Sequence, residues 1–197
     1  MDLTFKMLGW SGKTWPQRPQ EVAGMIEVLN SEGVRSYLEV GCRYGDTFHA
    51  VGLALPEGSR CVACDLPGWR NGVKSQRHPR SHKYLQRAAD DLSRKGRPAS
   101  VIIGDSHHHK TVAAVKALAP FDAVFIDGDH TYEGVVEDWR NYGPMARIVA
   151  FHDVVGKKPE TSGPRQLFSE LRASHRHKLI AVDPDPAACG IGVIWRD

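Results

Sequence analysis

The chain has 197 residues, of which 41% are hydrophobic, and its 26 basic and 23 acidic residues give a formal net charge of +3. A charge this balanced does not indicate a nucleic-acid or membrane partner, so recognition should depend on a local site. The length is typical of one domain with a single buried core, and we predict one domain over residues 1–197.

The amino-terminal residues MDLTFKMLGW lack the apolar core and small-residue cleavage site of a secretory leader, and the sequence contains no apolar run of about 18 residues. These features predict a cytoplasmic protein. The four cysteines indicate reduced thiols rather than a disulfide framework. If the segment CVAC (61–64) is a strand, its two cysteines face opposite sides of the sheet and cannot share one metal ion.

Five short apolar runs, closed by an acid or a glycine, predict buried strands at residues 36–40, 60–65, 100–105, 123–127 and 147–153. A helix-compatible segment at 19–30 precedes the first strand, and others follow at 45–54, 79–95, 109–118 and 132–141. Because strands and helices alternate, we expect a Rossmann-like α/β fold, in which a mostly parallel sheet carries helices on both faces.

The carboxyl-terminal part follows a different pattern. After a helix near 164–174, the segments HKLIAVD (177–183) and CGIGVIW (189–195) predict two strands on either side of the turn-rich PDPAA. We expect them to form an antiparallel hairpin that brings the sheet to seven strands. The segment 67–81 is long and basic, which fits either a mobile lid or a solvated surface loop.

Residues that could do chemistry follow the first two predicted strands. In an open parallel sheet, ligands bind beyond the carboxyl ends of the strands, near the point at which the strand order reverses. The first strand leads from Glu39 into a turn with Gly41 and Gly45, and Arg43 stands where a dinucleotide fingerprint has a glycine. Asp65 ends the second strand, where a carboxylate can accept hydrogen bonds from ribose hydroxyls. Together these residues predict a nucleoside-binding cleft.

The next two strand ends allow two interpretations each. The third strand leads into GDSHHH, in which Asp105 and Ser106 could meet an adenine edge or could form a capped helix start with exposed histidines. The fourth leads into Asp127, Asp129 and His130. The two aspartates could serve a site or could cap the helix that begins near residue 131, because Asp is favoured at a helix start.

The segments LEVGCRYGD, CVACD, VIIGDS, FDAVFIDGDHTYEGVVEDW and IVAFHDV, followed by a terminal hairpin, resemble the class I S-adenosylmethionine-dependent methyltransferases. Among these, the chain is most similar to methyltransferase family 24, relatives of the macrolide-sugar and rhamnosyl O-methyltransferases. The resemblance covers about residues 19–195, and its most specific part is FIDGDHTYEGVVEDW followed by FHD. The chain departs from the family in its thinned glycine turn and in PMAR, which replaces a glycine pair before the fifth strand.

The resemblance implies an enzyme that binds S-adenosylmethionine and methylates a hydroxyl group of a small molecule or sugar. The cofactor contacts that it implies are Glu39, Gly41, Arg43, Gly45, Asp65, Asp105, Ser106 and Asp127. A neutral alcohol is a poor nucleophile, so the enzyme must align it and help to remove its proton. In the related sugar methyltransferases a Mg²⁺ ion aligns and acidifies the hydroxyl, and a histidine acts as the base.

Carried onto this chain, the resemblance implies a divalent metal ion at Asp127, His152 and Asp153, with His130 as the catalytic base. Mg²⁺ prefers oxygen ligands, whereas imidazole suits zinc, iron or nickel better. Three alternatives therefore stay open: the metal could be another divalent ion, His152 could only flank it, or the enzyme could work without a metal.

Two other functional classes also stay open. A NAD-dependent Rossmann oxidoreductase would share the glycine turn and Asp65, but it would not need Asp127, His130 and Asp153 together. A non-catalytic nucleoside-binding module would bind the cofactor without turnover.

The identity of the acceptor does not follow from the motifs. Its selection is expected to depend on the amino-terminal segment with Trp10 and Trp15 and on the loop around Trp69, which no family motif constrains. No nucleic-acid or membrane partner is expected, and the sequence is compatible with a homo-oligomer.

Overall fold

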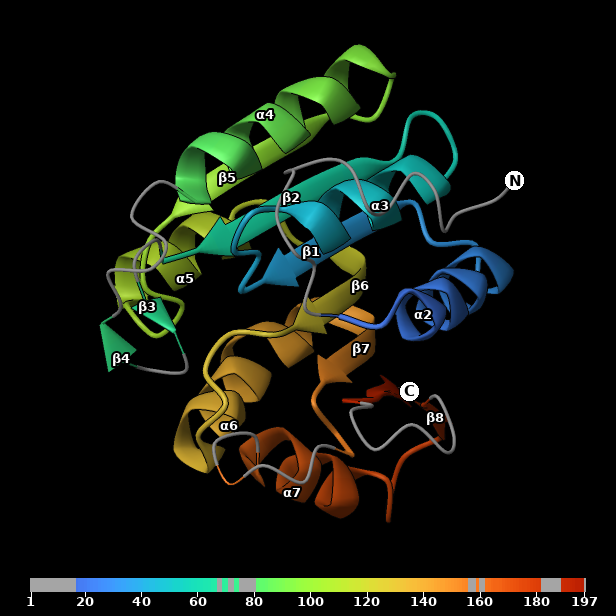
Figure 1. The fold of residues 1–197 in the computed structure, drawn as a ribbon, viewed down its shortest axis with the longest axis vertical. Helices are drawn as coiled ribbons and strands as arrows, with labels where there is room; N and C mark the ends of the chain where they lie inside the picture. The colour runs from blue at the N-terminus through green and yellow to red at the C-terminus, as the bar shows by residue number, and fades with distance from the viewer. Residues whose placement is uncertain are drawn as a thin grey trace.

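The computed structural model describes residues 17–66, 69–70, 73–74, 81–155, 159, 162–181 and 189–196, and its main feature is a seven-stranded sheet (Figure 1). The strands of this sheet are β1 (Ser36–Val40), β2 (Arg60–Asp65), β5 (Ala99–Ile103), β6 (Phe121–Ile126), β7 (Ala146–His152), β8 (His177–Ile180) and β9 (Ile191–Trp195). The described helices are α2 (Pro19–Ser31), α3 (Asp46–Ala54), α4 (Ser81–Arg94), α5 (His109–Lys116), α6 (Tyr132–Tyr142), α7 (Ser162–Leu171) and the 3-10 helix η1 (Gly143–Met145). The predicted Rossmann-like fold is confirmed.

The strand order reverses at the centre of the sheet. The order is β5-β2-β1-β6-β7-β9-β8, and the first five strands in it are parallel. The chain moves outward from β1 to β2 and β5 and then returns to β6 on the other side of β1. At such a reversal the connections on the two sides leave toward opposite faces, and a crevice forms beyond the strand ends.

Alternate residues of each strand enter one of two hydrophobic cores, as expected for strands covered on both faces. One core contains Tyr37, Cys61 and Phe125 with residues of α2, α3 and α4. The other contains Cys64 and Val124 with residues of α5, α6 and α7. Cys61 and Cys64 therefore point to opposite faces of β2, which confirms that they cannot share a metal ion.

The carboxyl-terminal strands form the predicted antiparallel pair, but the later strand lies inside the earlier one. β9 is inserted between β7 and β8 and runs antiparallel to both. All five residues of β9 are buried, whereas β8 forms the edge and is mostly exposed. β8 ends at Ile180, earlier than the predicted 177–183, and the predicted PDPAA turn lies outside the described residues.

Parts of the predicted acceptor region also lie outside the described residues. These include Trp10, Trp15 and most of segment 67–81. Within that segment the structure describes the short antiparallel pair β3 (Trp69–Arg70) and β4 (Val73–Lys74), and Ser81 at the start of α4. Among the described helices, none combines the length and apolar character that a membrane span requires.

Candidate active site

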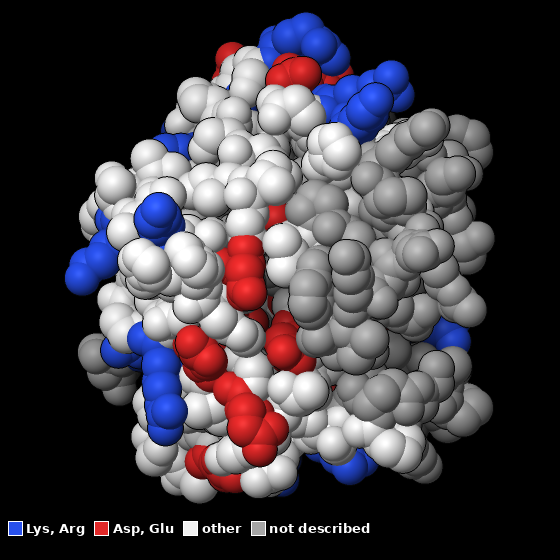
Figure 2. Space-filling view, turned by 90° about the vertical axis from the view of Figure 1, so that its left-hand side faces the viewer, with Lys and Arg blue, Asp and Glu red and all other residues white. Residues whose placement is uncertain are grey.

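The turns that follow β1 and β6 meet at the centre of the carboxyl edge of the sheet. The Asp127 N–H donates to the carbonyl of Val40 at 2.8 Å, and the Gly41 N–H donates to the carbonyl of Cys64 at 2.8 Å. Gly41 has φ +86°, and a Cβ atom added to it would lie 2.2 Å from the Asp127 carbonyl oxygen, so only glycine fits there. Figure 2 looks onto this edge and shows acidic side chains gathered down its middle, with Lys and Arg toward the rim.

Asp65 fixes the turn that follows β1. The Arg43 N–H donates to Asp65 Oδ1 at 2.9 Å, and Arg43 has φ +52°. Gly45 has φ +81°, forms the N-cap of α3, and donates its N–H to the carbonyl of Cys42 at 2.7 Å. The structure thus brings together the predicted cofactor residues at the ends of the first two strands. Asp65, which is predicted to bind the ribose, also holds the turn after β1 in place.

Glu39 lies beneath this turn. Its exposed fraction is 1%, and the Tyr37 hydroxyl donates to its Oε2 at 2.6 Å. Burial raises the pKa of Glu39 to about 8, although the hydrogen bond from Tyr37 lowers it. Burial likewise raises the pKa of Asp65 to about 6. Hydrogen-bond donors or a positive charge on a ligand would therefore favour the charged form of both carboxyl groups.

Two aspartates and two histidines converge beyond β6 and β7. His130 Nε2 lies 3.2 Å from Asp127 Oδ1, and His130 Nδ1 lies 3.0 Å from Asp153 Oδ2. His152 Nδ1 lies 3.3 Å from Asp127 Oδ1 and 3.5 Å from Asp153 Oδ2. The structure thus brings together the predicted base and the three predicted metal ligands beside the Gly41 turn. We call these four residues, Asp127, His130, His152 and Asp153, the His–Asp cluster.

The two carboxylates decide the protonation of both rings. Burial opposes a charge on His130 and His152, but the contacts with Asp127 and Asp153 outweigh it and raise the pKa of each histidine to about 10. Burial would raise the pKa of each aspartate, yet the two rings hold both values below the usual range. At neutral pH the four charges balance, and neither ring can accept a proton. A base role for His130 requires another cation to balance the aspartates.

The donor atoms of these residues suit such a cation. One ligand atom from each of Asp127, His130 and Asp153 lies within 4.8 Å of the other two. Two carboxylates can hold a divalent ion that keeps several waters. The residues present therefore fit a divalent cation at the carboxyl ends of β6 and β7.

Gln17 is a site residue that the sequence did not reveal. Its Nε2 donates to Asp127 Oδ2 at 2.7 Å, and its Oε1 accepts a hydrogen bond from the Thr47 hydroxyl of α3. Gln17 is buried, with an exposed fraction of 7%. It links Asp127 to the helix that follows the Gly41 turn, and no pattern in the segment before α2 distinguishes it from an ordinary polar residue.

Asp105 and Ser106 lie in the turn after β5. Asp105 is exposed, and its Oδ1 accepts the His107 N–H at 2.9 Å, as in a turn that starts a helix. The Tyr142 hydroxyl donates to the Ser106 carbonyl at 2.7 Å and so ties this turn to α6. The turn follows the carboxyl end of β5, which lies next to β2 in the sheet, and contact of either residue with adenine stays a prediction.

The three histidines after Ser106 differ in their surroundings, so the alternative of a helix start with exposed histidines holds only in part. His108 and His109 are exposed, but His107 is partly buried. His107 Nε2 lies 3.2 Å from Oδ1 of Asp138, whose exposed fraction is 0%. The contact with Asp138 raises the pKa of His107 to about 9. Sequence spacing could not show this pair, because it joins the β5–α5 turn to α6.

The His107–Asp138 pair predicts a pH-dependent contribution to stability. Since the pKa of His107 is raised to about 9 in the folded chain, its contribution is complete below the unfolded value of about 6.5 and is lost as the pH rises through 9. We expect His107→Gln to lower the unfolding free energy by on the order of 1–3 kcal/mol at pH 6, with a smaller deficit above pH 9. Urea unfolding of both proteins across this range measures the difference, and a deficit that does not change with pH would exclude the ion pair as its cause.

Of the two aspartates that could cap the helix after β6, only Asp129 lies at the helix start. Thr131 is the N-cap of α6, and its hydroxyl accepts the Gly134 N–H at 3.1 Å. Asp129 Oδ1 accepts the Thr131 N–H at 2.9 Å, which is a helix-start role. Asp127 instead directs its carboxylate to Gln17 and the two histidines, so it lies in the site rather than at the helix start.

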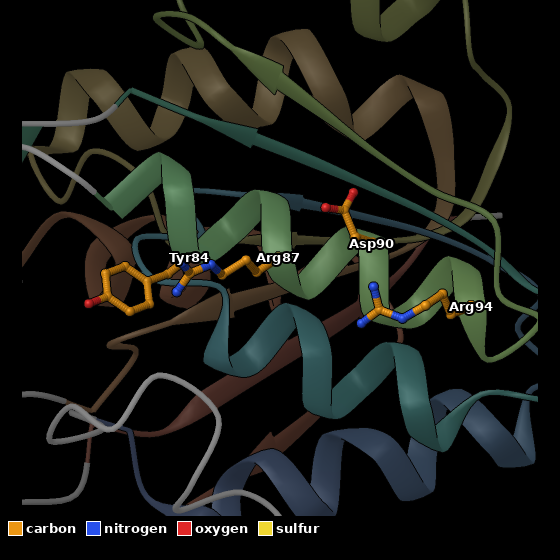
Figure 3. Close-up of a pocket in the computed structure, with 4 residues that line it drawn as sticks. All are labelled: Tyr84, Arg87, Asp90 and Arg94. Atoms are coloured by element: carbon orange, nitrogen blue, oxygen red, sulfur yellow. The ribbon is translucent and has the colours of Figure 1, made fainter.

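A groove outside this cluster lies along α4. It is lined by Tyr84, Arg87, Asp90 and Arg94, and their side chains project from one side of that helix (Figure 3). These residues include no member of the His–Asp cluster and none of the predicted cofactor contacts. The His–Asp cluster therefore remains the candidate active site.

Comparison with known proteins identifies related sequences and folds. A family model described as a methyltransferase domain, of the methyltransferase 24 type, matches residues 38–154, which run from within β1 to just past β7 and include the whole His–Asp cluster. A search of curated proteins found no match.

Solved structures with the same fold cover nearly the whole chain. Cofactor-bound Rv0187 from MTB has a TM-score of 0.73 and 16% identity, with 99% of this chain and 89% of that chain covered. An O-methyltransferase from Bacillus cereus in complex with SAH has a TM-score of 0.65 and 16% identity, covering 91% and 82%. The O-methyltransferase TomG from Streptomyces achromogenes, involved in tomaymycin synthesis, has a TM-score of 0.64 and 18% identity, covering 90% and 79%. At these identities the likeness establishes the fold.

Proposed function

Because the chain belongs to the class I S-adenosylmethionine-dependent methyltransferases of the family 24 type, we propose that it transfers a methyl group to a hydroxyl oxygen of a small molecule or sugar. The observation that carries this proposal is the convergence of Asp127, His130, His152 and Asp153 beside the glycine turn. Transfer to oxygen requires a proton to leave, and this cluster combines ligands for a cation with a histidine that could accept the proton once that cation balances the aspartates. Family membership also makes an oxidoreductase role the weaker alternative.

The cofactor is proposed to lie across the carboxyl ends of β2, β1 and β6. The turn from Gly41 to Gly45 offers close backbone approach for the methionine part, and the buried Asp65 carboxylate would accept the ribose hydroxyls. Asp105 and Ser106 would border the adenine. This path places the sulfonium methyl group near Asp127, where the turns after β1 and β6 touch.

The acceptor side is proposed to be formed by the His–Asp cluster. A divalent cation held by Asp127, Asp153 and His152 would acidify and align the acceptor hydroxyl when bound. His130 contacts both aspartates and is proposed to take the hydroxyl proton. It can do so only as a neutral ring. The ring can be neutral when the bound cation, instead of the ring's own proton, balances the charge of the two carboxylates. The Asp127 oxygen bound to Gln17 fixes the orientation of that carboxylate.

A direct assay tests this function. The purified chain is incubated with S-adenosylmethionine, divalent ions and a panel of hydroxylated small molecules and sugars, alongside matched amine and thiol compounds. We expect S-adenosylhomocysteine to form and a hydroxylated acceptor to gain one methyl group by mass spectrometry. Methylation confined to amines or thiols would contradict the choice of oxygen. Cofactor binding without turnover on any acceptor class would favour the non-catalytic module instead.

A variant of Asp65 tests the cofactor assignment. We expect Asp65→Ala to weaken S-adenosylmethionine binding by on the order of 1.5–3 kcal/mol, because a charged hydrogen-bond acceptor is lost. Isothermal calorimetry measures the change. The matched control is Asp122→Asn, since Asp122 also accepts backbone N–H groups but lies at the amino-terminal edge of the sheet. Unchanged affinity in a folded Asp65→Ala protein would defeat the assignment.

A further inference from the structure

The donors at the end of β7 differ from those that Mg²⁺ prefers. His152, Asp153 and Cys189 each offer one ligand atom, and these three atoms lie within 4.8 Å of one another. Mg²⁺ takes oxygen ligands and keeps much of its water, whereas imidazole nitrogen and thiolate sulfur select zinc, iron and cobalt. A thiol beside a histidine and a carboxylate therefore favours a softer divalent ion than Mg²⁺ at the end of β7.

The backbone holds Cys189 next to Asp153. The Val155 N–H donates to the Cys189 carbonyl at 2.9 Å, and the Val154 N–H lies 3.4 Å from the Gly190 carbonyl. Gly190 in turn donates its N–H to Glu21 Oε1 at 3.1 Å. The residues that follow Asp153 are thus bonded to the residues that precede β9, and this pairing brings the thiol to the cluster.

His152 directs its Nδ1 at the two aspartates. The exposed fraction of His152 is 6%, and Nδ1 lies 3.3 Å from Asp127 Oδ1 and 3.5 Å from Asp153 Oδ2. Because the two nitrogens of an imidazole ring point in different directions, Nδ1 is the nitrogen that can share an ion with these carboxylates.

We propose that His152, Asp153 and Cys189 bind a divalent transition-metal ion such as Zn²⁺, Fe²⁺ or Co²⁺ in preference to Mg²⁺. In a tetrahedral site with bonds of about 2.0–2.3 Å, ligand atoms are separated by roughly 3.3–3.8 Å, so side-chain shifts of about 1 Å would complete the coordination. Asp127 Oδ1, which lies 3.3 Å from His152 Nδ1, is the nearest candidate for a fourth ligand. Binding releases two protons to solvent, one from the Cys189 thiol and one from the His152 ring, which is protonated in the absence of the ion. The proposal rests on the proposed function only in assigning this ion to the same cleft.

Cobalt serves as a spectroscopic probe of the site. The full chain is stripped with a chelator, kept reduced with a phosphine, and titrated with Co²⁺. We expect one bound equivalent, visible bands of a four- or five-coordinate ion, and a near-ultraviolet thiolate-to-cobalt charge-transfer band. Cys189→Ser should abolish that band and weaken Co²⁺ binding by at least about tenfold, the scale on which even indirect metal contacts act. Cys61→Ala is the matched control, because Cys61 is a buried thiol in the core of β2 and should leave the band intact.

The outcomes separate this proposal from the methyl-transfer proposal. Co²⁺ binding without the charge-transfer band, survival of the band in Cys189→Ser, or displacement of Co²⁺ by an equal concentration of Mg²⁺ would overturn the metal assignment. If circular dichroism shows that Cys189→Ser does not fold, Cys189→Ala replaces it in the test of the charge-transfer band. His152→Gln then tests the nitrogen ligand, because its loss should change the visible cobalt bands. A protein that binds Co²⁺ through Cys189 but forms no S-adenosylhomocysteine would retain this site and lose the proposed function.

Discussion

Replacing His130 with alanine is expected to lower kcat by about 10² to 10⁴, the usual contribution of a positioned general base, while cofactor affinity stays nearly unchanged. The physical reason is the position of the ring, which lies 3.2 Å from Asp127 and 3.0 Å from Asp153 beyond the carboxyl ends of β6 and β7. A base that touches both proposed ion ligands is placed to act on a hydroxyl group bound between them. Steady-state kinetics on the acceptor found by the assay, together with calorimetry for the cofactor, measures the two effects separately.

The control for this variant is another buried histidine that contacts an aspartate. His49 Nε2 lies 2.8 Å from Asp91 Oδ2 between α3 and α4, away from the cluster. His49→Gln should therefore keep a near-normal kcat, even if it lowers the melting temperature. A His130→Ala protein that is folded and retains the wild-type kcat would remove His130 from the catalytic role. Activity lost in proportion to unfolding would return His130 to a structural role.

Removal of divalent ions is expected to stop turnover without preventing cofactor binding. In the ion-free cluster the two aspartates raise the pKa of His130 to about 10, so the ring is protonated at neutral pH and cannot act as a base. The acceptor would also lose the group that lowers the pKa of its hydroxyl. Activity is measured after dialysis against a chelator and again after Mg²⁺, Mn²⁺, Co²⁺ or Zn²⁺ is restored. Full turnover in verified metal-free buffer would show that the enzyme works without an ion.

The fold could be predicted from the sequence because its signals are local. Apolar runs closed by acids or glycine placed β1 and β2 at the observed residues, and the alternation with helices gave the parallel sheet. The strand-end rule then placed Asp65 and Asp127 at one edge. The insertion of β9 between β7 and β8 could not be read in the same way, because order within a sheet depends on which faces are buried and not on sequence order.

The missing parts of the site are long-range contacts. Gln17 lies 110 positions from Asp127 in the chain, and nothing in its neighbours marks it as a ligand of that carboxylate. Nothing in the sequence distinguishes Cys189 from the other reduced thiols, although it lies beside Asp153 in the folded chain. The charge state of His130 was also missed, since a reference pKa near neutrality ignores two carboxylates that only the folded chain brings to the ring.

The contact between Gly41 and Asp127 implies thermodynamic linkage between binding of the cofactor and binding of the divalent ion. A Cβ on Gly41 would lie 2.2 Å from the Asp127 carbonyl oxygen, so neither turn can shift without moving the other. A ligand that orders one turn therefore reduces the entropy that the second ligand must lose, and each should raise the affinity of the other by the same factor. Couplings of this kind are typically about 1–3 kcal/mol, or roughly 5- to 150-fold. Titrating cofactor with and without the ion, and the ion with and without cofactor, measures both sides of the cycle, and a factor of one would mean that the two turns respond independently.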